Sequence, residues 1–199
     1  MTAHDFDLLY DYFVNQGGLE LVFGLDDLNS RDSDMNWDPT GAEALLDYFE
    51  TKNYTLAALE LGNEPDLDPR KNRNISATQL SLDFDVLQSV LQGRKLGIPV
   101  FGPDVAFSNS YLADFAGNQS VSTQAKVNAV TVHHYYGNSA DFKLADFLSV
   151  KTLDSLKDTL EGLEHAKASL TDIPMYLGET SSTYGGKQWL PAKPSICRN

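Results

Sequence analysis

The sequence predicts an α/β fold, and within that class an incomplete (β/α)8 TIM barrel that contains about strands 3 to 7 with the helices between them. Short apolar runs alternate five times with segments of helical periodicity, which is typical of a parallel sheet. Polar residues follow at least three of these runs, on the side where barrel active sites are built. A complete barrel needs about 250 residues, whereas this chain has 199.

An open, doubly wound sheet is the alternative α/β architecture. Such sheets bind nucleotides through glycine-rich loops, but no Gly-x-Gly-x-x-Gly turn and no Walker-type loop follows any predicted strand. A flavodoxin-like nucleotide-binding protein therefore has no support in the motifs, and we prefer the barrel. The Asp-rich stretch 26–39 lacks the spacing of an EF-hand, and we predict no cofactor and no metal ion.

The order of the elements follows from apolar periodicity and from the residues that interrupt it. Apolar runs bounded by glycine or proline predict strands at 19–25, 56–61, 99–102, 127–136 and 174–178. Helical spacing of apolar residues predicts helices at 5–16, from residue 40 onward, and at 76–95, 109–115 and 153–170. Thr40 is followed three residues later by Glu43, the pattern of a capping box, so we expect Thr40 to be the N-cap of the second helix.

The composition indicates one globular domain with an acidic surface. Hydrophobic residues make up 42% of the chain, and 28 aspartates and glutamates outnumber 15 lysines and arginines, which gives a net charge of −13. This charge argues against nucleic acid as a partner and weakens the case for a polyanionic ligand. The largest basic cluster lies at 70–73, and we interpret it as a solvated loop.

Few processing signals are visible in the chain. Cys197 is the single cysteine, so we expect no internal disulfide. No signal peptide follows Met1 and no apolar run approaches the roughly 18 residues of a membrane span, so we expect no transmembrane segment. Three sequons, each in or beside a predicted loop, are predicted glycosylation sites and favour a secretory origin: Asn53, Asn74 and Asn118.

Two predicted strands end in a glutamate. Glu64 follows the strand at 56–61, and Pro65 is expected to restrain Glu64 to an extended backbone. The pattern recurs at Glu179 after the strand at 174–178. A pair of carboxyl groups can hydrolyse a glycosidic bond when one protonates the leaving oxygen and the other attacks the anomeric carbon. For either residue alone, a solvated or helix-capping carboxylate is the alternative interpretation.

The sequence motifs around these glutamates resemble those of a known family. Asn63-Glu64-Pro65 and Gly178-Glu179-Thr180 resemble the retaining glycosidases of a large barrel clan. Four segments, at 59–65, 101–105, 130–136 and 177–186, resemble successive blocks of the heparanase family, whose members are endo-β-glucuronidases that cut heparan sulfate. The resemblance covers roughly residues 6–186. It implies a retaining mechanism with Glu64 as acid/base and Glu179 as nucleophile, a glucuronide-containing polysaccharide as partner, and a secreted or lysosomal location.

The resemblance also implies six substrate-binding residues: Asn63, His133, Tyr135, Tyr184, Gly185 and Gly186. Asn63 matches a residue that bonds the sugar 2-hydroxyl, and the tyrosine at 135 is expected near the nucleophile, where its hydroxyl would keep that carboxylate ionised. Gly185 and Gly186 belong to a loop that meets the uronic acid. An ordinary strand with alternate core residues, and a surface turn at 184–186, are the alternative interpretations.

The chain also departs from that family. The segment 106–112 matches a basic cluster of the family but contains no lysine or arginine, and a family arginine aligns near Ala140. A less sulfated glucuronide is therefore as good a candidate for the substrate as heparan sulfate. The family's first two strands, eighth strand and β-sandwich domain have no counterpart. We expect residues 1–186 to form a partial barrel catalytic domain, inactive by itself because of its unpaired edges, and 187–199 to form a divergent C-terminal tail. The alternative is a non-catalytic protein that binds glycan or a partner.

Overall fold

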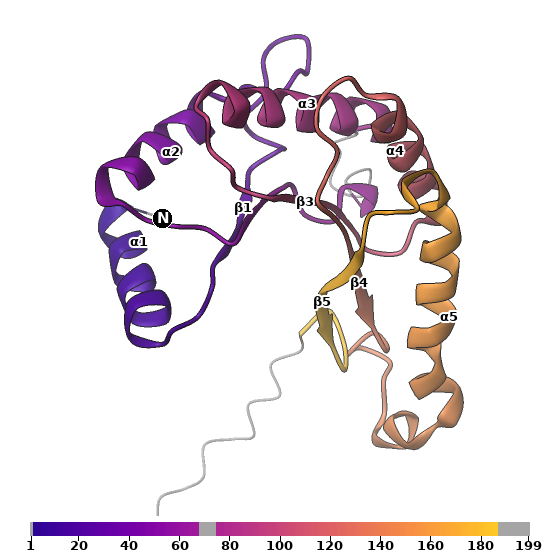
Figure 1. Ribbon diagram of the computed structural model, residues 1–199. Coiled ribbons are helices and arrows are strands. Elements are labelled where there is room, and N and C mark those ends of the chain that lie inside the picture. Colours follow the sequence, from indigo (N-terminus) through magenta and orange to yellow (C-terminus); the bar gives the residue numbers. More distant parts are fainter. Residues whose placement is uncertain (1, 68–74, 187–199) are drawn as a thin grey trace, which may run out of the picture.

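The protein forms a curled parallel sheet with helices on its convex face (Figure 1). The computed structural model describes residues 2–67 and 75–186. The strands follow one another in chain order, and each is parallel to the next. They are β1 (Val22–Leu25), β2 (Ala58–Leu61), β3 (Val100–Val105), β4 (Ala129–Tyr135) and β5 (Met175–Ser181). The predicted α/β class with a parallel sheet is therefore confirmed.

A helix or helix pair precedes every strand, as right-handed parallel connections require. The α-helices are α1 (Ala3–Tyr10), α2 (Thr40–Lys52), α3 (Ala77–Gly93), α4 (Asn109–Val121) and α5 (Val150–Ala166). Shorter helical turns are η1 (Asp11–Gln16, a π-helix), η3 (Leu144–Leu148) and η4 (Ala168–Leu170). No helix among the described residues is long and apolar enough to cross a membrane.

The main core lies between the sheet and α3 and α4. The apolar stripe of α3 is fully buried, and Phe84 in its centre packs against Phe115 of α4 with ring centroids 5.2 Å apart. Burial of each such side chain contributes roughly 1.5–3 kcal/mol. Gly102 in β3 allows this packing, because a Cβ there would lie 2.3 Å from Cζ of Phe84. A second cluster, around Phe6 and Phe49, joins α1 to α2.

The start of α2 differs from the prediction. Pro39 is the N-cap and makes no side-chain cap bond, and Thr40 is already the first helical residue. The Thr40 backbone N–H and hydroxyl both donate to Oδ1 of Asp38, at 3.0 and 2.6 Å. The predicted capping box is therefore wrong, because the Thr40 hydroxyl donates its hydrogen bond to the Asp38 carboxylate two residues earlier.

Helix α4 and strand β5 are longer than predicted. Gln119 is buried and its Nε2 donates to Oγ of Ser81 on α3 at 3.0 Å, which fixes the second half of α4 against its neighbour. Asn118 therefore lies inside a helix and not beside a loop, and its Nδ2 donates to the carbonyl of Asp114 at 2.7 Å. Strand β5 continues to Ser181, so Glu179 belongs to the strand itself.

Of the other two predicted glycosylation sites, only Asn53 lies among the described residues. Asn53 is exposed at the C-cap of α2, with a left-handed φ of 55°. Asn74 and the predicted tail at 187–199 lie outside the described residues. Glycosylation and the domain boundary at residue 186 stay predictions.

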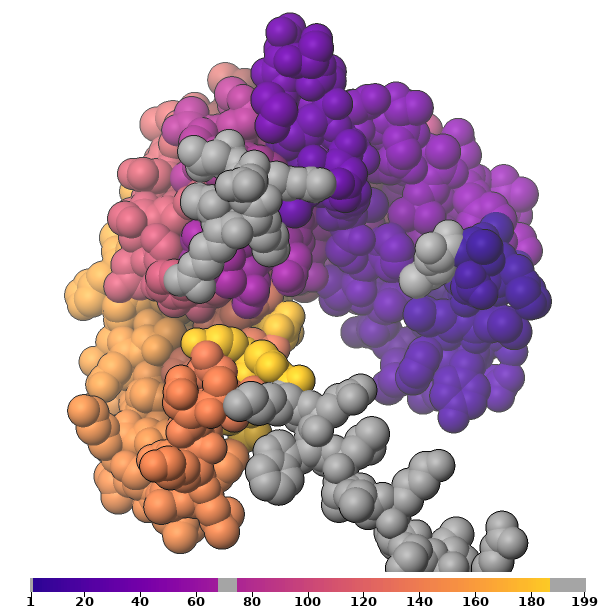
Figure 2. Space-filling model, turned by 180° about the vertical axis from the view of Figure 1, so that it is seen from behind, coloured from indigo at the N-terminus to yellow at the C-terminus, as the bar shows by residue number. Residues whose placement is uncertain are grey.

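The concave face of the sheet is open. Figure 2 shows the N-terminal and C-terminal parts on the two sides of a wide hollow. Strands β1 and β5 form the two edges of the described sheet. On the concave face, the rings of Phe101 and Tyr176 meet at 5.5 Å across β4, and Tyr176 remains 48% exposed.

A buried ion pair attaches the loop before α2 to α3. The Arg31 guanidinium donates to Asp83 at 2.7 Å, and the two side chains are 4% and 2% exposed. Removing one partner of such a pair leaves an uncompensated buried charge. We expect Asp83→Ala to lower the free energy of unfolding by about 3 kcal/mol, measured by urea denaturation. Glu161→Ala, which removes an exposed pair with Lys157, is the control, and an equally small loss in both variants would contradict the prediction.

Candidate active site

Glu64 lies in a tight turn just beyond β2. Its backbone N–H donates to the carbonyl of Asp104 at 3.0 Å, and its φ of 51° is left-handed. The extended conformation expected from Pro65 is therefore wrong. Gly62, with a φ of 88°, begins the turn, and the hydrogen bond that Glu64 donates to Asp104 holds Glu64 in a region that a residue other than glycine rarely adopts.

Strand β4 presents alternate residues to the concave face. His133 is 3% exposed and lies opposite Glu179 of β5. The register between β4 and β5 shifts between Val132 and His133, and this shift pairs His133 with Glu179 and not with Gly178. His134 points to the other face, where its Nε2 lies 3.3 Å from Oγ of Ser155 in α5. A β-strand's period of two separates the two histidines in this way.

The two glutamates converge on His133. Its Nδ1 lies 3.2 Å from Oε1 of Glu64 and 3.9 Å from Oε2 of Glu179. One carboxylate oxygen of Glu64, one of Glu179 and one His133 ring nitrogen all lie within 4.8 Å of one another. Carboxyl groups about 5–5.5 Å apart are typical of retaining glycosidases, so the spacing suits a double-displacement reaction.

The environment of His133 favours its charged form. Burial lowers the pKa of the ring, but hydrogen bonds to Asp104 and Glu64 and the charges of Asp104 and Glu179 outweigh that effect and raise the pKa to about 9. Its Nε2 lies 3.4 Å from Oδ1 of Asp104, which is 4% exposed. At neutral pH the ring is therefore a cation among three carboxyl groups.

Tyr135 lies at the end of β4, beside Glu179. Its hydroxyl donates a short hydrogen bond to Oε1 of Glu179. This bond, with partial burial and the nearby carboxylate charges, raises the pKa of Tyr135 to about 12, so the tyrosine stays a donor at neutral pH. The second oxygen of Glu179 is the one that faces His133.

The loop after β5 returns to the same rim. Tyr184 pairs with Asn138, its backbone N–H donates to the carbonyl of Gly137 at 3.0 Å, and its ring meets that of Tyr135 at 6.1 Å. Gly185 has a φ of 81°, which few side chains tolerate. Gly186 and Asn63 are exposed. The structure thus brings Tyr184 to the carboxyl pair, whereas among the described residues neither Asn63 nor Gly186 makes a hydrogen bond to it.

Three carboxyl groups near the site were not among the predicted site residues. Asp104 contacts His133, and its N–H donates to Oγ1 of Thr131 at 3.1 Å. Glu60 lies on the concave face of β2, where burial, and then the charge of Asp104, raise its pKa to about 7. Asp66 accepts three backbone hydrogen bonds from the loop at 106–108. For Asp104 the sequence does hold a signal, because Gly102-Pro103-Asp104 interrupts an apolar run and then presents an acid, although β3 continues through it to Val105.

The carboxyl pair and His133 also have donor types that could hold a metal ion. Metal ligation requires a neutral imidazole. Because the pKa of His133 is raised to about 9, protons compete with a metal at that nitrogen at neutral pH. The donor set therefore suits a protonated hydrogen-bond network better than a metal centre.

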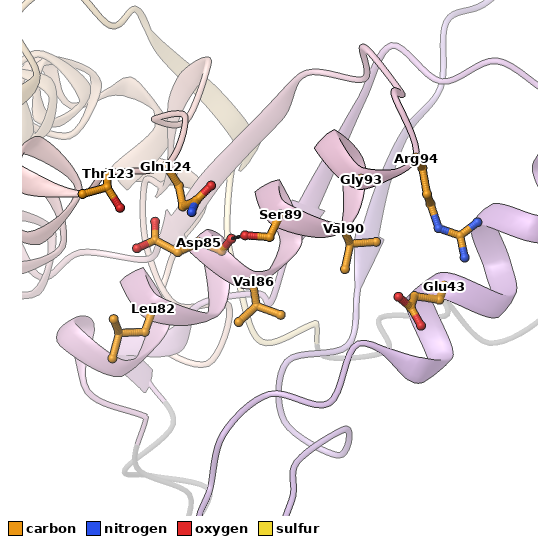
Figure 3. A pocket seen from close by; sticks show the side chains of 10 residues that line it. All are labelled: Glu43, Leu82, Asp85, Val86, Ser89, Val90, Gly93, Arg94, Thr123 and Gln124. Carbon is orange, nitrogen blue, oxygen red and sulfur yellow. Dashed lines mark hydrogen bonds between the residues drawn. The ribbon is translucent and has the colours of Figure 1, made fainter.

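Two hollows differ in chemistry. One, of about 430 Å³, lies beside the carboxyl pair and is lined by Glu64, Leu67, Ala106, Phe107, His134, Tyr135, Tyr136, Ser155, Thr159 and Tyr184. The other, of about 660 Å³, lies on the helical face between α2, α3 and the segment after α4, with Arg94 and Glu43 at one end and Gln124 at the other (Figure 3). Arg94 is already paired there with Asp47 and Glu50. The smaller hollow is the candidate substrate site, because it contains Glu64.

A curled parallel α/β sheet with glutamates at the C-terminal ends of two strands is the arrangement of a (β/α)8-barrel glycoside hydrolase. Solved structures support the fold. A monomeric β-xylosidase from Caulobacter crescentus matches with a TM-score of 0.64 and 18% identity, over 92% of this chain and 42% of that one. A 4-O-α-L-rhamnosyl-β-D-glucuronidase from Fusarium oxysporum matches with a TM-score of 0.63 and 18% identity, over 89% and 39%. The predicted incomplete barrel is confirmed.

Sequence comparison identifies the family. Residues 2–191 match the family model described as glycosyl hydrolase family 79, N-terminal domain, and the chain belongs to this family. It is 34% identical over 183 residues to heparanase of Bos taurus, covering 90% of this chain and 33% of that protein. It is 30% identical over 167 residues to inactive heparanase-2 of Homo sapiens, covering 82% and 28%. The chain thus spans about one third of the length of these relatives, and the resemblance to the heparanase family is confirmed.

The raised pKa of His133 predicts a pH-dependent stability. Because the pKa rises from 6.5 to about 9 on folding, the stabilisation from the protonated ring is fully present below pH 6.5 and is lost as the pH rises through about 9. We expect the difference in unfolding free energy between wild type and His133→Gln to shrink by roughly 3 kcal/mol across this range. Urea denaturation at several pH values measures it.

His165→Gln is the matched control, because His165 is exposed on α5. The chemical shifts of the His133 ring nitrogens give a direct midpoint by NMR. A midpoint near 6.5, or a stability difference that does not change with pH, would contradict the prediction.

Proposed function

We propose that the protein that carries this chain hydrolyses β-glucuronide linkages with retention of configuration. The observation that carries the proposal is the convergence of Glu64 and Glu179 on His133, with carboxylate oxygens within 4.8 Å. A glycosaminoglycan such as heparan sulfate is the proposed substrate, in line with the relatives named heparanase. The secreted or lysosomal location stays a prediction from the resemblance.

In the proposed reaction the two glutamates have different tasks. Glu179 attacks the anomeric carbon, and the Tyr135 hydroxyl stabilises the carboxylate and aims its free oxygen. Glu64 takes up a proton when the substrate binds and donates it to the leaving oxygen, and it later accepts a proton from the water that releases the sugar. The protonated His133 contacts both carboxylates, so it offsets their mutual repulsion while the substrate is absent. Asn63, Tyr184, Gly185 and Gly186 stay proposed contacts to the sugar.

A non-catalytic role is the second candidate. The match to inactive heparanase-2 favours it. Such a protein would keep the scaffold and bind a glycan or a partner. Turnover of a glucuronide separates the two candidates, because a binding protein releases no product.

The first test uses 4-nitrophenyl β-glucuronide and the full-length protein. We expect hydrolysis in the wild type and a loss of at least roughly 10³-fold in kcat for Glu179→Gln, because the amide cannot attack the anomeric carbon. Glu161→Gln, an exposed glutamate on α5, is the control. NMR of the first product should show the β-anomer. Unchanged turnover in Glu179→Gln would remove this residue from the mechanism, and no turnover in the wild type would favour the non-catalytic role.

A second test concerns Tyr135. Its hydroxyl contacts Glu179 and not Glu64, so Tyr135→Phe should impair the nucleophile's attack while the ring and its packing remain. We expect kcat/KM to fall roughly 10- to 100-fold, with the thermal stability little changed. Tyr176→Phe, on the same concave face, is the control. Equal activity in Tyr135→Phe and wild type would contradict the assigned contact.

A further inference from the structure

The buried ring of His133 lies between two carboxyl groups. Its Nδ1 lies 3.2 Å from Oε1 of Glu64, and its Nε2 lies 3.4 Å from Oδ1 of Asp104. A neutral imidazole carries one N–H and one bare nitrogen, whereas an ionised carboxylate can only accept hydrogen bonds. The ring therefore satisfies both carboxylates only when each nitrogen is protonated, and a neutral ring fits only if one carboxyl group carries a proton. The three side chains thus share one proton.

The two carboxyl groups differ in their surroundings. The side chain of Asp104 is 5% exposed, and a Cβ at Gly178 would lie 3.2 Å from its Oδ1, so β5 packs against this carboxylate. The side chain of Glu64 is 21% exposed. Asp104 therefore fixes the Nε2 side of the ring, and Glu64 is the more accessible partner. The shared proton has two places, which are Nδ1 of His133 and the carboxyl group of Glu64.

In the resting protein the ring holds this proton. Burial lowers the pKa of His133, but the contacts with Asp104 and Glu64 and the charge of Glu179 raise it to about 9. Glu60 on β2 is the fourth carboxyl group whose charge is coupled to the ring. Among the described residues Glu60 makes no hydrogen bond to His133 or Glu64, so it does not share the proton. Glu64 needs that proton at the moment it acts as an acid.

We propose that His133 stores the proton that Glu64 delivers to the leaving oxygen. If the proposed function holds, on which this proposal rests, Nδ1 of His133 gives its proton to Oε1 of Glu64. Glu64 then protonates the glycosidic oxygen as its bond to the anomeric carbon breaks and Glu179 bonds to that carbon. The ring is left neutral, and its remaining N–H, at Nε2, faces Asp104.

The second half of the reaction returns the proton. Water attacks the anomeric carbon, Glu64 accepts a proton from this water, and Glu179 leaves as a carboxylate. The proton then moves from Glu64 to Nδ1 of His133. One water is consumed for each bond that is hydrolysed, and the ring ends the cycle as the cation with which it began.

Glu179 couples the proton transfer to its own attack. Its Oε2 lies 3.9 Å from Nδ1 of His133, and its negative charge stabilises the ring cation. This charge is lost when Glu179 bonds to the sugar, so the cation becomes a stronger acid. The proton is thereby released to Glu64 when the leaving oxygen needs it. His133 acts through Glu64 and is a positioning residue for this proton.

The first test compares phenyl and 4-nitrophenyl β-glucuronide with the full-length protein. The nitro group makes the leaving oxygen less basic, so the phenyl compound depends more strongly on a donated proton. We expect His133→Gln to lower kcat/KM at pH 7 roughly tenfold more for the phenyl than for the nitrophenyl compound. His165→Gln, an exposed histidine on α5, is the matched control. Equal losses for both compounds would show a merely structural role and overturn the proposal.

The pH profile gives a second readout. In the wild type the shared proton is lost as the pH rises through the pKa of the ring, whereas in His133→Gln only Glu64 can hold it, with an ordinary glutamate pKa of about 4.3. For the phenyl compound, the basic limb of kcat/KM should therefore lie at least roughly one pH unit lower in the variant. A limb at the same pH in both proteins would contradict the proposal. His133→Asn is the second variant, and thermal melting shows whether each variant is folded.

A measurement on the unmutated protein does not depend on the folding of any variant. A 2-deoxy-2-fluoro-β-glucuronyl fluoride should trap the sugar on Glu179. We expect the NMR midpoint of the His133 ring nitrogens to fall by at least roughly one pH unit in the trapped protein, because the carboxylate charge is gone. An unchanged or higher midpoint would overturn the proton store.

The same experiments separate this proposal from the proposed function. If the wild type hydrolyses glucuronides but shows neither the substrate difference nor the shift of the midpoint, only the proton store fails. If the wild type neither hydrolyses a glucuronide nor is trapped by the fluoride, the proposed function fails and the role of His133 fails with it.

Discussion

The contacts of His133 with three carboxyl groups are the constraint on which the site depends. Two carboxylates about 5 Å apart repel each other by roughly 3 kcal/mol at an effective dielectric constant of 20. The His133 cation lies 3.2 Å from Glu64, 3.9 Å from Glu179 and 3.4 Å from Asp104, so it offsets this repulsion. The buried ring in turn keeps its charge because these carboxyl groups surround it. Carboxylate oxygens of glutamates that follow or belong to strands that are not neighbours can therefore lie within 4.8 Å of each other.

Asp104 connects this charge network to the backbone. Its carbonyl accepts the N–H of Glu64, its own N–H donates to Thr131, and its carboxylate faces His133. The ends of β2, β3 and β4 are thus tied together by one residue. Asp104 and Glu64 both adopt left-handed φ angles, of 55° and 51°, and such conformations persist where surrounding bonds determine them. The backbone of Glu64 is therefore positioned by a residue forty positions later in the chain.

The contacts among Glu64, Glu179 and His133 form within an incomplete barrel. Those that the described residues make come from β2, β3, β4, β5 or the loops that follow them. The concave face that a closed barrel would fill remains open, with Tyr176 half exposed and the pKa of Glu60 raised to about 7 by its partial burial and by Asp104. Edge strands such as β1 and β5 have unpaired backbone groups with which further strands can form hydrogen bonds. This agrees with a chain that spans about one third of its relatives' length.

The sequence by itself determined the order of strands and helices, the parallel class of the sheet and the two strand-end glutamates, because periodicity, glycine and proline act over a few residues. Local rules failed where another hydrogen-bond partner competes. The nearby Asp38 accepts the hydroxyl of Thr40, and two distant contacts do the rest: Asp104 holds Glu64 in a left-handed turn, and Gln119 bonds to Ser81 and so extends α4 through Asn118. Only the tertiary structure decided the register shift that sets His133 opposite Glu179 and the charge of the ring. Both depend on groups tens of residues apart, and no local pattern encodes their distance or burial.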